Sequence, residues 1–255
     1  MPELLAGKTA LILGVANKWS LAYAIAHAFR REGAKLLLTY QGERQKETVT
    51  ELGSELGAAA IFECDVTREE DLTKLAETVR QHGRLDALVH SIAFANREDL
   101  TKPFVETSRA GYLLAQDVSA YSLVSAARTV APLMTEGGSV ITLSYLGATR
   151  VVTNYNVMGV AKAALEACVR YLSSDLGPSN IRVNAISAGP VKTASARAVA
   201  GLSKMLETMP TRAPLRRNCT PEEVADTAVF LASDLGRGVT GNVLFVDAGY
   251  QVMGF

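Results

Sequence analysis

A tyrosine and a lysine stand seven residues apart in the segment TNYNVMGVAKAAL, residues 153–165. On one face of a helix, such a pair can offer a proton donor beside a nicotinamide ribose. The commoner spacing is four, but the residue four before Lys162 is Met158, which has no proton to give. Seven residues make almost two helical turns. Tyr155 and Lys162 should therefore share a face, roughly 10 Å apart along the axis, against about 6 Å for a spacing of four.

A second substitution accompanies the displaced tyrosine. Enzymes that reduce carbonyl groups with such a pair carry a serine thirteen residues before their tyrosine, and counting back from Met158 reaches Tyr145. The candidate catalytic residues are therefore Tyr145, Tyr155 and Lys162. Both tyrosines could instead be half-buried aromatic residues with satisfied hydroxyls. Lys162 is harder to explain in that way, because its neighbours are apolar and a buried lysine is rare without a partner.

A regular α/β framework is expected to position these residues. Apolar runs that read as buried strands cover residues 8–14, 34–40, 59–65, 85–91, 138–144, 181–187 and 242–248. Segments with helical spacing lie between them, among them Leu21–Arg31, Arg68–Gln81 and Val157–Asp175. Buried strands that alternate with helices predict a doubly wound, Rossmann-type α/β fold with a seven-stranded parallel sheet flanked by helices. We expect a single domain over residues 1–255.

One long stretch, at about residues 190–214, contains no expected strand. It follows the sixth strand, so it emerges at the carboxyl edge of the sheet, where ligands bind in such folds. A long excursion there predicts a lid that covers the substrate. Its segment ARAVAGLSKMLETM can form an amphipathic helix with Val199, Leu202, Leu206 and Met209 broadly on one side. A plain surface helix that packs on the core is the alternative.

The first expected strand ends in a glycine, Gly14, where a dinucleotide pyrophosphate would meet the amino end of a helix. The full G-x-G-x-x-G fingerprint is absent, but small residues follow at Ser20 and Ala22. The Ser20 hydroxyl is a candidate phosphate ligand. It could equally be a plain helix cap behind a turn glycine.

The second and third expected strands end in polar residues. An acid that binds the ribose of NAD would be expected after the second strand, and Gln41 stands there instead. A neutral amide can bond ribose hydroxyls without repelling a 2′-phosphate, so Gln41 permits either cofactor; we favour NADH over NADPH. Gln41 could also merely cap the loop. Asp65, followed by Val66, could accept from an adenine amino group, cap the next helix, or do both.

The composition argues against several other classes of function. The 26 basic and 26 acidic residues balance, which opposes a general electrostatic grip on nucleic acid or acidic membranes. No apolar run approaches the length of a membrane span, and the amino end shows no signal peptide. The three cysteines are odd in number and widely spaced, which indicates reduced thiols and a cytoplasmic protein. The three histidines have no metal-ligand spacing, so no metal is expected.

The whole set of motifs resembles a divergent branch of the short-chain dehydrogenase/reductases, the NADH-dependent enoyl-[acyl carrier protein] reductases of bacteria. The resemblance covers essentially the full chain. It rests on the residues Gly14, Ser20 and Ala22 and on HSIAFA at residues 90–95. It rests further on SYLGATRVVTNYNVMGVAKAALE, on RVNAISAGPVKT at residues 182–193, and on TGNVLFVDAGYQVMG near the carboxyl end. The Tyr-x6-Lys signature, with a second tyrosine ten residues upstream, is its most specific part.

This resemblance implies that NADH reduces the trans-2 double bond of an enoyl group carried on acyl carrier protein, in fatty-acid elongation. Tyr155 would stabilise the enolate oxygen and Lys162 would hold the nicotinamide ribose. The implied cofactor-binding residues are Gly14, Ser20, Leu21, Gln41, Asp65, Val66, Ser91, Ile92, Lys162, Val191, Lys192, Thr193, Ala194 and Ser195. The implied substrate-binding residues are Ala95, Tyr145, Tyr155 and Met158.

Two other functions fit the same fold. A ketone or alcohol oxidoreductase is opposed by Met158 and the missing serine. A regulator that senses NAD(H) without catalysis is opposed by Tyr155 and Lys162, since a sensor needs no proton donor. The family also implies a homotetramer built on the alanine-rich helices expected at Thr107–Met134 and Val157–Asp175. In a monomer both helices would simply cover the sheet.

Overall fold

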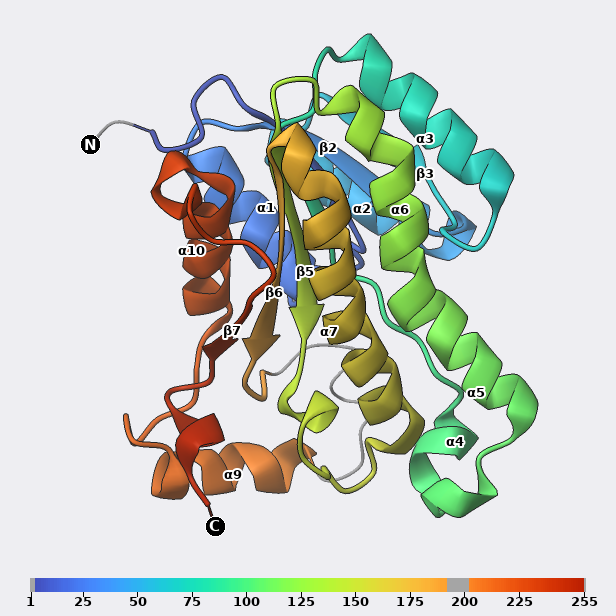
Figure 1. Cartoon of the computed structure of the whole chain (residues 1–255), viewed down its shortest axis with the longest axis vertical. Coiled ribbons are helices and arrows are strands. Elements are labelled where there is room, and N and C mark those ends of the chain that lie inside the picture. The colour runs from blue at the N-terminus through green and yellow to red at the C-terminus, as the bar shows by residue number, and fades with distance from the viewer. Residues whose placement is uncertain (1–2, 192–201, 255) are drawn as a thin grey trace.

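All seven expected strands are present, in one parallel sheet. The computed structural model describes residues 3–191 and 202–254 (Figure 1). The strands are β1 (Thr9–Leu13), β2 (Lys35–Tyr40), β3 (Ala60–Glu63), β4 (Ala87–His90), β5 (Gly138–Ser144), β6 (Ile181–Ala188) and β7 (Val243–Val246). Their order is β3-β2-β1-β4-β5-β6-β7, and every neighbouring pair is parallel. The direction of winding reverses between β1 and β4, and ligands bind at this point in open α/β sheets.

The helices alternate with the strands as the sequence predicts. They are α1 (Leu21–Arg31), α2 (Glu43–Glu55), α3 (Glu69–Gln81), α4 (Arg97–Thr101), α5 (Arg109–Gln116), α6 (Ser122–Val130), α7 (Asn156–Leu176), α9 (Leu202–Arg212) and α10 (Pro221–Ala232). The three helices that the sequence delimited as α1, α3 and α7 agree with the structure to within one residue at each end. The Rossmann-type prediction is therefore confirmed.

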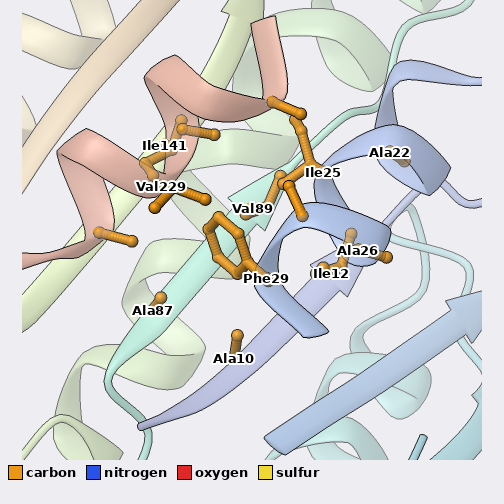
Figure 2. Packing of buried hydrophobic residues seen from close by; sticks show 14 of the residues in the cluster. Ala10, Ile12, Ala22, Ile25, Ala26, Phe29, Ala87, Val89, Ile141 and Val229 are labelled. Atoms are coloured by element: carbon orange, nitrogen blue, oxygen red, sulfur yellow. The ribbon is translucent and has the colours of Figure 1, made fainter. Parts of the chain in front are cut away.

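Two apolar cores hold the layers together, one on each face of the sheet. Helices α1, α2 and α10 pack on one face, and α3, α6 and α7 pack on the other. Figure 2 shows Phe29 of α1 lying among Val229 of α10 and the strand residues Ala10 and Val89. Phe29 is fully buried. Because both faces are covered, the strands can be apolar throughout, which explains the runs in the sequence.

The expected helix Thr107–Met134 is not one regular helix, and this prediction was wrong in detail. The Ser108 side chain accepts a hydrogen bond from the Gly111 amide at 2.9 Å and caps α5. A π-helical turn, Asp117–Tyr121, then separates α5 from α6. A 3-10 turn at Ala131–Leu133, which contains Pro132, closes the segment because proline cannot continue an α-helix.

The stretch at about 190–214 leaves the sheet at its carboxyl edge. Figure 1 shows α9 along that edge, below the ends of β5 and β6. Within α9, Met209 is buried and Leu206 partly buried, as expected of an amphipathic helix, whereas Val199 lies outside the described residues. Among the helices that the structure describes, none combines the length and apolar character needed to cross a membrane.

Candidate active site

A cavity of about 460 Å³ opens at the carboxyl edge of the sheet, where the winding reverses between β1 and β4. Thirteen residues singled out from the sequence line it: Gly14, Ser20, Leu21, Gln41, Val66, Ser91, Ile92, Ala95, Tyr145, Tyr155, Met158, Lys162 and Val191. Asp65 is not in its wall but lies directly behind Gln41, to which it is bonded. The predicted residues Lys192, Thr193, Ala194 and Ser195 lie outside the described residues.

Gly14 allows two strands to approach each other at the bottom of the cavity. Its φ is 93°, a left-handed conformation that favours glycine. A Cβ atom at this position would overlap the carbonyl oxygen of Ser91. The Ser91 amide in turn donates to the carbonyl oxygen of Leu13 at 3.1 Å. Gly14 therefore allows the segments that follow β1 and β4 to pack closely at the wall of the cavity.

Ser20 is the N-cap of α1. Its hydroxyl accepts from the Tyr23 amide at 3.2 Å and donates to the carbonyl oxygen of Asn17 at 2.7 Å. The capping role that the sequence left open is therefore present. Contact with a phosphate stays a prediction, supported by the position of Ser20 in the cavity wall.

Gln41 and Asp65 form a pair at the outer end of the cavity. The Gln41 side-chain amide donates to Asp65 Oδ2 at 3.0 Å. Asp65 Oδ1 accepts from both the amide and the hydroxyl of Thr67, at 2.9 and 2.7 Å. Burial alone would raise the pKa of Asp65, but these hydrogen bonds outweigh it and lower the pKa. Neither residue is the N-cap of a helix, because Gly42 and Arg68 occupy the N-cap positions of α2 and α3, where no side-chain capping bond is made.

Tyr155 stands at the entrance of α7 between two asparagines in the left-handed region. Asn154 has φ 63° and Asn156 has φ 37°, conformations that are uncommon for residues other than glycine. The Asn156 side chain donates to the carbonyl oxygens of Leu100 and Lys102, at 3.0 and 2.7 Å. These bonds stabilise the turn that presents the phenol. Gly147 makes room for the phenol ring, because a Cβ there would overlap the Tyr155 ring.

The two candidate tyrosines touch each other. Their rings meet edge to face with centroids 5.0 Å apart and an interplanar angle of 68°. Burial raises the pKa of the Tyr155 phenol, and burial also raises that of Tyr145 to about 12. Both hydroxyls therefore keep their protons at neutral pH. The Tyr145 hydroxyl lies 3.7 Å from Met205 Sδ of α9, so it faces the stretch at the carboxyl edge.

Lys162 lies one turn of α7 after Met158, whose side chain forms an apolar part of the cavity wall. It is 5% exposed, and its ammonium group donates to the carbonyl oxygen of Leu143 at 2.8 Å. Burial lowers the pKa of Lys162 to about 8, although the Glu166 carboxylate acts in the opposite direction. Met158 is itself buried, with Val157 and Ala161. The structure thus brings the phenol, the ammonium group and the thioether into one cavity, as the spacing predicts.

The sequence did not identify a buried polar network behind this wall. His90 is fully buried, with Nε2 at 2.8 Å from the Ser122 hydroxyl and Nδ1 at 3.0 Å from the Thr142 hydroxyl. Burial, with the nearby charge of Lys162, lowers the pKa of His90 to about 3, so it is neutral. The Ser122 hydroxyl also donates to the carbonyl oxygen of Val118 at 2.6 Å, and the Thr142 hydroxyl donates to the carbonyl oxygen of His90 at 3.2 Å.

A neighbouring serine ties the π-helical turn to the cavity wall. The Ser119 hydroxyl accepts from the amide of Phe94 at 2.9 Å and donates to its carbonyl oxygen at 3.1 Å. The wider turn brings this serine opposite the HSIAFA segment. The regular helical spacing of the sequence around Ser119 gives no sign of a π-turn, so this contact could not be foreseen.

Six further cavity-lining residues lie in the motifs that carry the resemblance but were not named as site residues: Ala93, Phe94, Ser144, Ala188, Gly189 and Pro190. Ten more were not singled out from the sequence: Ala16, Asn17, Thr39, Tyr40, Gln45, Cys64, Leu100, Val118, Leu143 and Met205. Most belong to strand ends or to the turns directly after them, so strand position was the available signal. Among the described residues, no group of three or more His, Cys, Asp or Glu side chains is placed to hold a metal ion.

The cavity fits a dinucleotide. Its wall contains the backbone of Gly14, the amino end of α1 and the buried ammonium group of Lys162. These are the features that a pyrophosphate and a ribose require: close backbone, helix amides and a cation. The Tyr155 phenol, a hydrogen-bond donor, lines the same cavity.

Comparisons with known proteins agree with this geometry. The family model described as enoyl-(acyl carrier protein) reductase matches residues 14–251. An enoyl-[acyl-carrier-protein] reductase [NADH] of Bacillus cereus is 54% identical over 99% of this chain and 100% of its own length. A Staphylococcus aureus enzyme of the same name, but marked [NADPH], is 48% identical over 98% of both chains. A crystal structure of the Bacillus cereus reductase with NADP+ and indole naphthyridinone superposes with a TM-score of 0.98, covering 99% of this chain and 100% of that chain at 54% identity.

Proposed function

The chain belongs to the enoyl-(acyl carrier protein) reductase family, and from this premise we propose how its own residues carry out the reaction. The protein is an oxidoreductase of fatty-acid synthesis that reduces enoyl groups carried on acyl carrier protein with NADH. The alternatives of a ketone or alcohol oxidoreductase and of a non-catalytic sensor are set aside. Within this reaction we give the individual side chains separate roles.

The observation that carries the proposal is the shared cavity of Tyr155 and Lys162, with Met158 between them in the sequence. NADH supplies a hydride, which forms a C–H bond at the β-carbon of the enoyl thioester. The electron pair of the double bond then moves towards the thioester carbonyl and leaves negative charge on its oxygen. That oxygen lies further from the hydride acceptor than a ketone oxygen would. A donor displaced by one helical turn suits this difference.

We assign the stabilisation of that oxygen to Tyr155. Its pKa is raised, so the phenol remains a hydrogen-bond donor throughout the neutral range. A preorganised donor in a partly dry cavity is worth far more than one in water. The strained turn at Asn154 and Asn156 holds the phenol before substrate arrives.

We assign the nicotinamide ribose to Lys162. At neutral pH the ammonium group is charged, since its pKa is about 8. It can keep one proton on the Leu143 carbonyl and direct the other two at hydroxyls in the cavity. Its positive charge also favours the developing enolate.

The remaining predicted residues divide along the cavity. Ala95, Tyr145 and Met158 would line the acyl side with Tyr155, and Tyr145 should contribute less because its hydroxyl faces Met205. The other cofactor contacts would be made by Gly14, Ser20, Leu21, Gln41, Asp65, Val66, Ser91, Ile92 and Val191. The neutral Gln41 side chain permits either cofactor, and NADH is expected because the relatives most similar among those compared are marked for it.

The two touching tyrosines provide a matched test. Oxidation of NADH and of NADPH would be followed in parallel with a short trans-2-enoyl thioester, for the wild type, Tyr155→Phe and Tyr145→Phe. We expect a loss of kcat of about 10²–10³-fold in Tyr155→Phe, as for the removal of an oxyanion donor, and a much smaller loss in Tyr145→Phe. Equal losses in the two variants would contradict the separate roles.

We also propose a homotetramer. Large apolar side chains are exposed on and around α5 and α7, among them Tyr112, Leu113, Tyr121 and Tyr171. Exposed patches of this kind mark interfaces. Light scattering of the wild type should give four times the 27.2 kDa of one chain. Leu113→Glu should reduce that mass, and a monomeric wild type would refute this assembly.

We further propose that the chain acts as one domain over residues 1–255 and works in the cytoplasm. The seven strands of one sheet draw on nearly the whole chain, from Thr9 to Val246. The three cysteines are all free thiols, two of them buried, as is usual in a reducing compartment. A single cooperative unfolding transition and recovery in the cytoplasmic cell fraction are the expected results.

A further inference from the structure

Two residues of α7 bond two successive residues at the end of β5. Lys162 donates to the carbonyl oxygen of Leu143 at 2.8 Å. One helical turn later, Glu166 Oε1 accepts from the hydroxyl of Ser144 at 2.5 Å. All four residues are buried. The end of the strand is therefore held to the helix at two neighbouring points by one cationic and one anionic side chain.

This double attachment lies directly before the reacting groups. Tyr145 follows Ser144 in the chain, and its ring packs edge-on against Tyr155. Tyr155 begins the same helix that carries Lys162 and Glu166. Movement of the end of β5 relative to α7 would therefore change both the Tyr145–Tyr155 contact and the hydrogen bond from the Lys162 ammonium group to Leu143.

Glu166 also influences the charge of the site. It is 7% exposed and raises the pKa of Lys162 against the effect of burial. Burial raises the pKa of Glu166 itself, while the Ser144 hydroxyl, Arg170 and Lys162 act to lower it. The charges of this pair also act on two neighbours: together with burial, Glu166 raises the pKa of Tyr155 at the start of α7, and Lys162 lowers that of His90 on β4.

We propose that Glu166 is a positioning residue of the reductase, which anchors the end of β5 through Ser144 and supplies the counter-charge to the Lys162 ammonium group. Glu166 does not line the cavity and so would act only through these two neighbours. The inference deepens the proposed function, because it rests on the assignment of Lys162 to the cofactor.

Two substitutions separate the bond from the charge. Glu166→Gln keeps an oxygen that can accept from Ser144 but removes the negative charge. Ser144→Ala keeps the carboxylate but removes the bond. Asp175→Asn is the control, because Asp175 is an exposed carboxylate about 14 Å beyond Glu166 along the same helix. The measurements are NADH affinity by fluorescence from pH 6 to 10, kcat and KM with an enoyl thioester, and the melting temperature of the cofactor-free protein.

In Glu166→Gln, the pH at which NADH affinity is half lost should fall by about one unit relative to wild type, because a neighbouring opposite charge supports the lysine's proton. Ser144→Ala should keep the wild-type midpoint but lower kcat several-fold. Asp175→Asn should match the wild type in every measurement. A purely structural role would lower only the melting temperature.

A wild-type midpoint in Glu166→Gln, or a wild-type kcat in Ser144→Ala, would overturn this inference. Failure of the proposed function looks different. If Lys162→Met binds NADH as tightly as wild type at pH 7, the lysine is not a cofactor ligand. That result would reject both the assignment of Lys162 to the nicotinamide ribose and this inference. If Lys162→Met binds NADH more weakly than wild type, the assignment stands, and the Glu166→Gln and Ser144→Ala measurements then test the inference separately.

Discussion

The cavity has two ends that hold their polar groups in different ways. At the outer end, Gln41 is exposed, Asp65 is partly exposed, and the two bond each other at 3.0 Å. At the inner end, Lys162 and two residues behind the cavity wall, Glu166 and His90, are all less than 9% exposed, and burial displaces the pKa of each. We call these the Gln41 end and the Lys162 end.

The difference in burial predicts which polar groups are sensitive to substitution. An exposed hydrogen bond to a ligand replaces one to water, so its loss changes affinity little. A buried polar group has already lost its water, so removal of its partner is expensive. The Gln41 end should therefore tolerate substitution, and the Lys162 end should not. Relatives marked for NADH and for NADPH fit a tolerant outer end.

The largest effect is expected from Lys162→Met. Loss of two charged hydrogen bonds to ribose hydroxyls, at about 1.5 kcal/mol or more each, should raise the KM for NADH roughly 100-fold. The melting temperature should also fall, because the substitution leaves the buried Glu166 carboxylate without its counter-charge and the Leu143 carbonyl oxygen without its donor. Lys46→Met, an exposed lysine on α2, is the control and should change KM less than about twofold. A similar KM in both variants would remove the contrast between the two ends.

Gly14→Ala tests the backbone that lines the cavity between the Gln41 end and the Lys162 end. The substitution adds left-handed strain and forces the Ser91 carbonyl to move. We expect NADH affinity to fall at least about tenfold, or about 1.4 kcal/mol. Gly83→Ala is a matched control, because Gly83 has φ 97° but no atom within 4 Å of its added Cβ. Titration of NADH fluorescence should leave Gly83→Ala near wild type, and equal losses in the two variants would show that strain alone matters.

The pH dependence should also follow the Lys162 end. With a pKa of about 8, the lysine loses its proton above that pH, and kcat/KM for NADH should then fall by about tenfold per pH unit. The contribution of Lys162 to stability has the opposite sign. Its pKa is lower in the folded protein than the ordinary 10.5, so the unfolded state binds more protons between about pH 8 and 10.5.

Within that window, the lysine's contribution favours the folded state increasingly as pH rises. Activity lost above pH 8 should therefore return on neutralisation, and melting curves should show the protein still folded. If the pH profile of kcat/KM is flat to pH 9.5, Lys162 does not bind in its charged form.

The smallest effect is expected from Gln41→Ala. One exposed hydrogen bond to the ligand should be worth a KM increase of about threefold for NADH. The ratio of NADH to NADPH turnover should change little, since Gln41 carries no charge to attract or repel a 2′-phosphate. Measured with both cofactors at one ionic strength, a loss as large as that of Lys162→Met would reverse the ranking of the two ends.

The sequence predicted the framework well because buried parallel strands leave an unambiguous pattern. It also predicted that Tyr145, Tyr155 and Lys162 lie together. Tyr155 and Lys162 are seven residues apart at the start of one helix, and Tyr145 directly follows a strand only ten residues before Tyr155, so short-range spacing was sufficient. It could not predict the π-helical turn, because Ser119 and Ser122 look like ordinary helix residues. Their partners, Phe94 and His90, lie 25 and 32 residues away in the chain.

Glu166 had a signal that went unused. A glutamate four residues after a lysine, in the apolar stretch GVAKAALEACV of one helix, indicates a buried pair of opposite charges. Its bond to Ser144 depends on how α7 lies against β5, which spacing along one element does not define. Local periodicity therefore predicted the pair Tyr155 and Lys162, whereas the contacts of Glu166 with its neighbours depend on tertiary packing.

The central claim is that the displaced phenol directs the cavity to a carbon–carbon double bond. The most direct measurement is kcat/KM with NADH for a trans-2-enoyl thioester and for the 3-ketoacyl thioester of the same chain length. We predict turnover of the enoyl substrate and negligible turnover of the ketone. Preference for the ketone, or the same preference in Tyr155→Phe as in wild type, would contradict this claim.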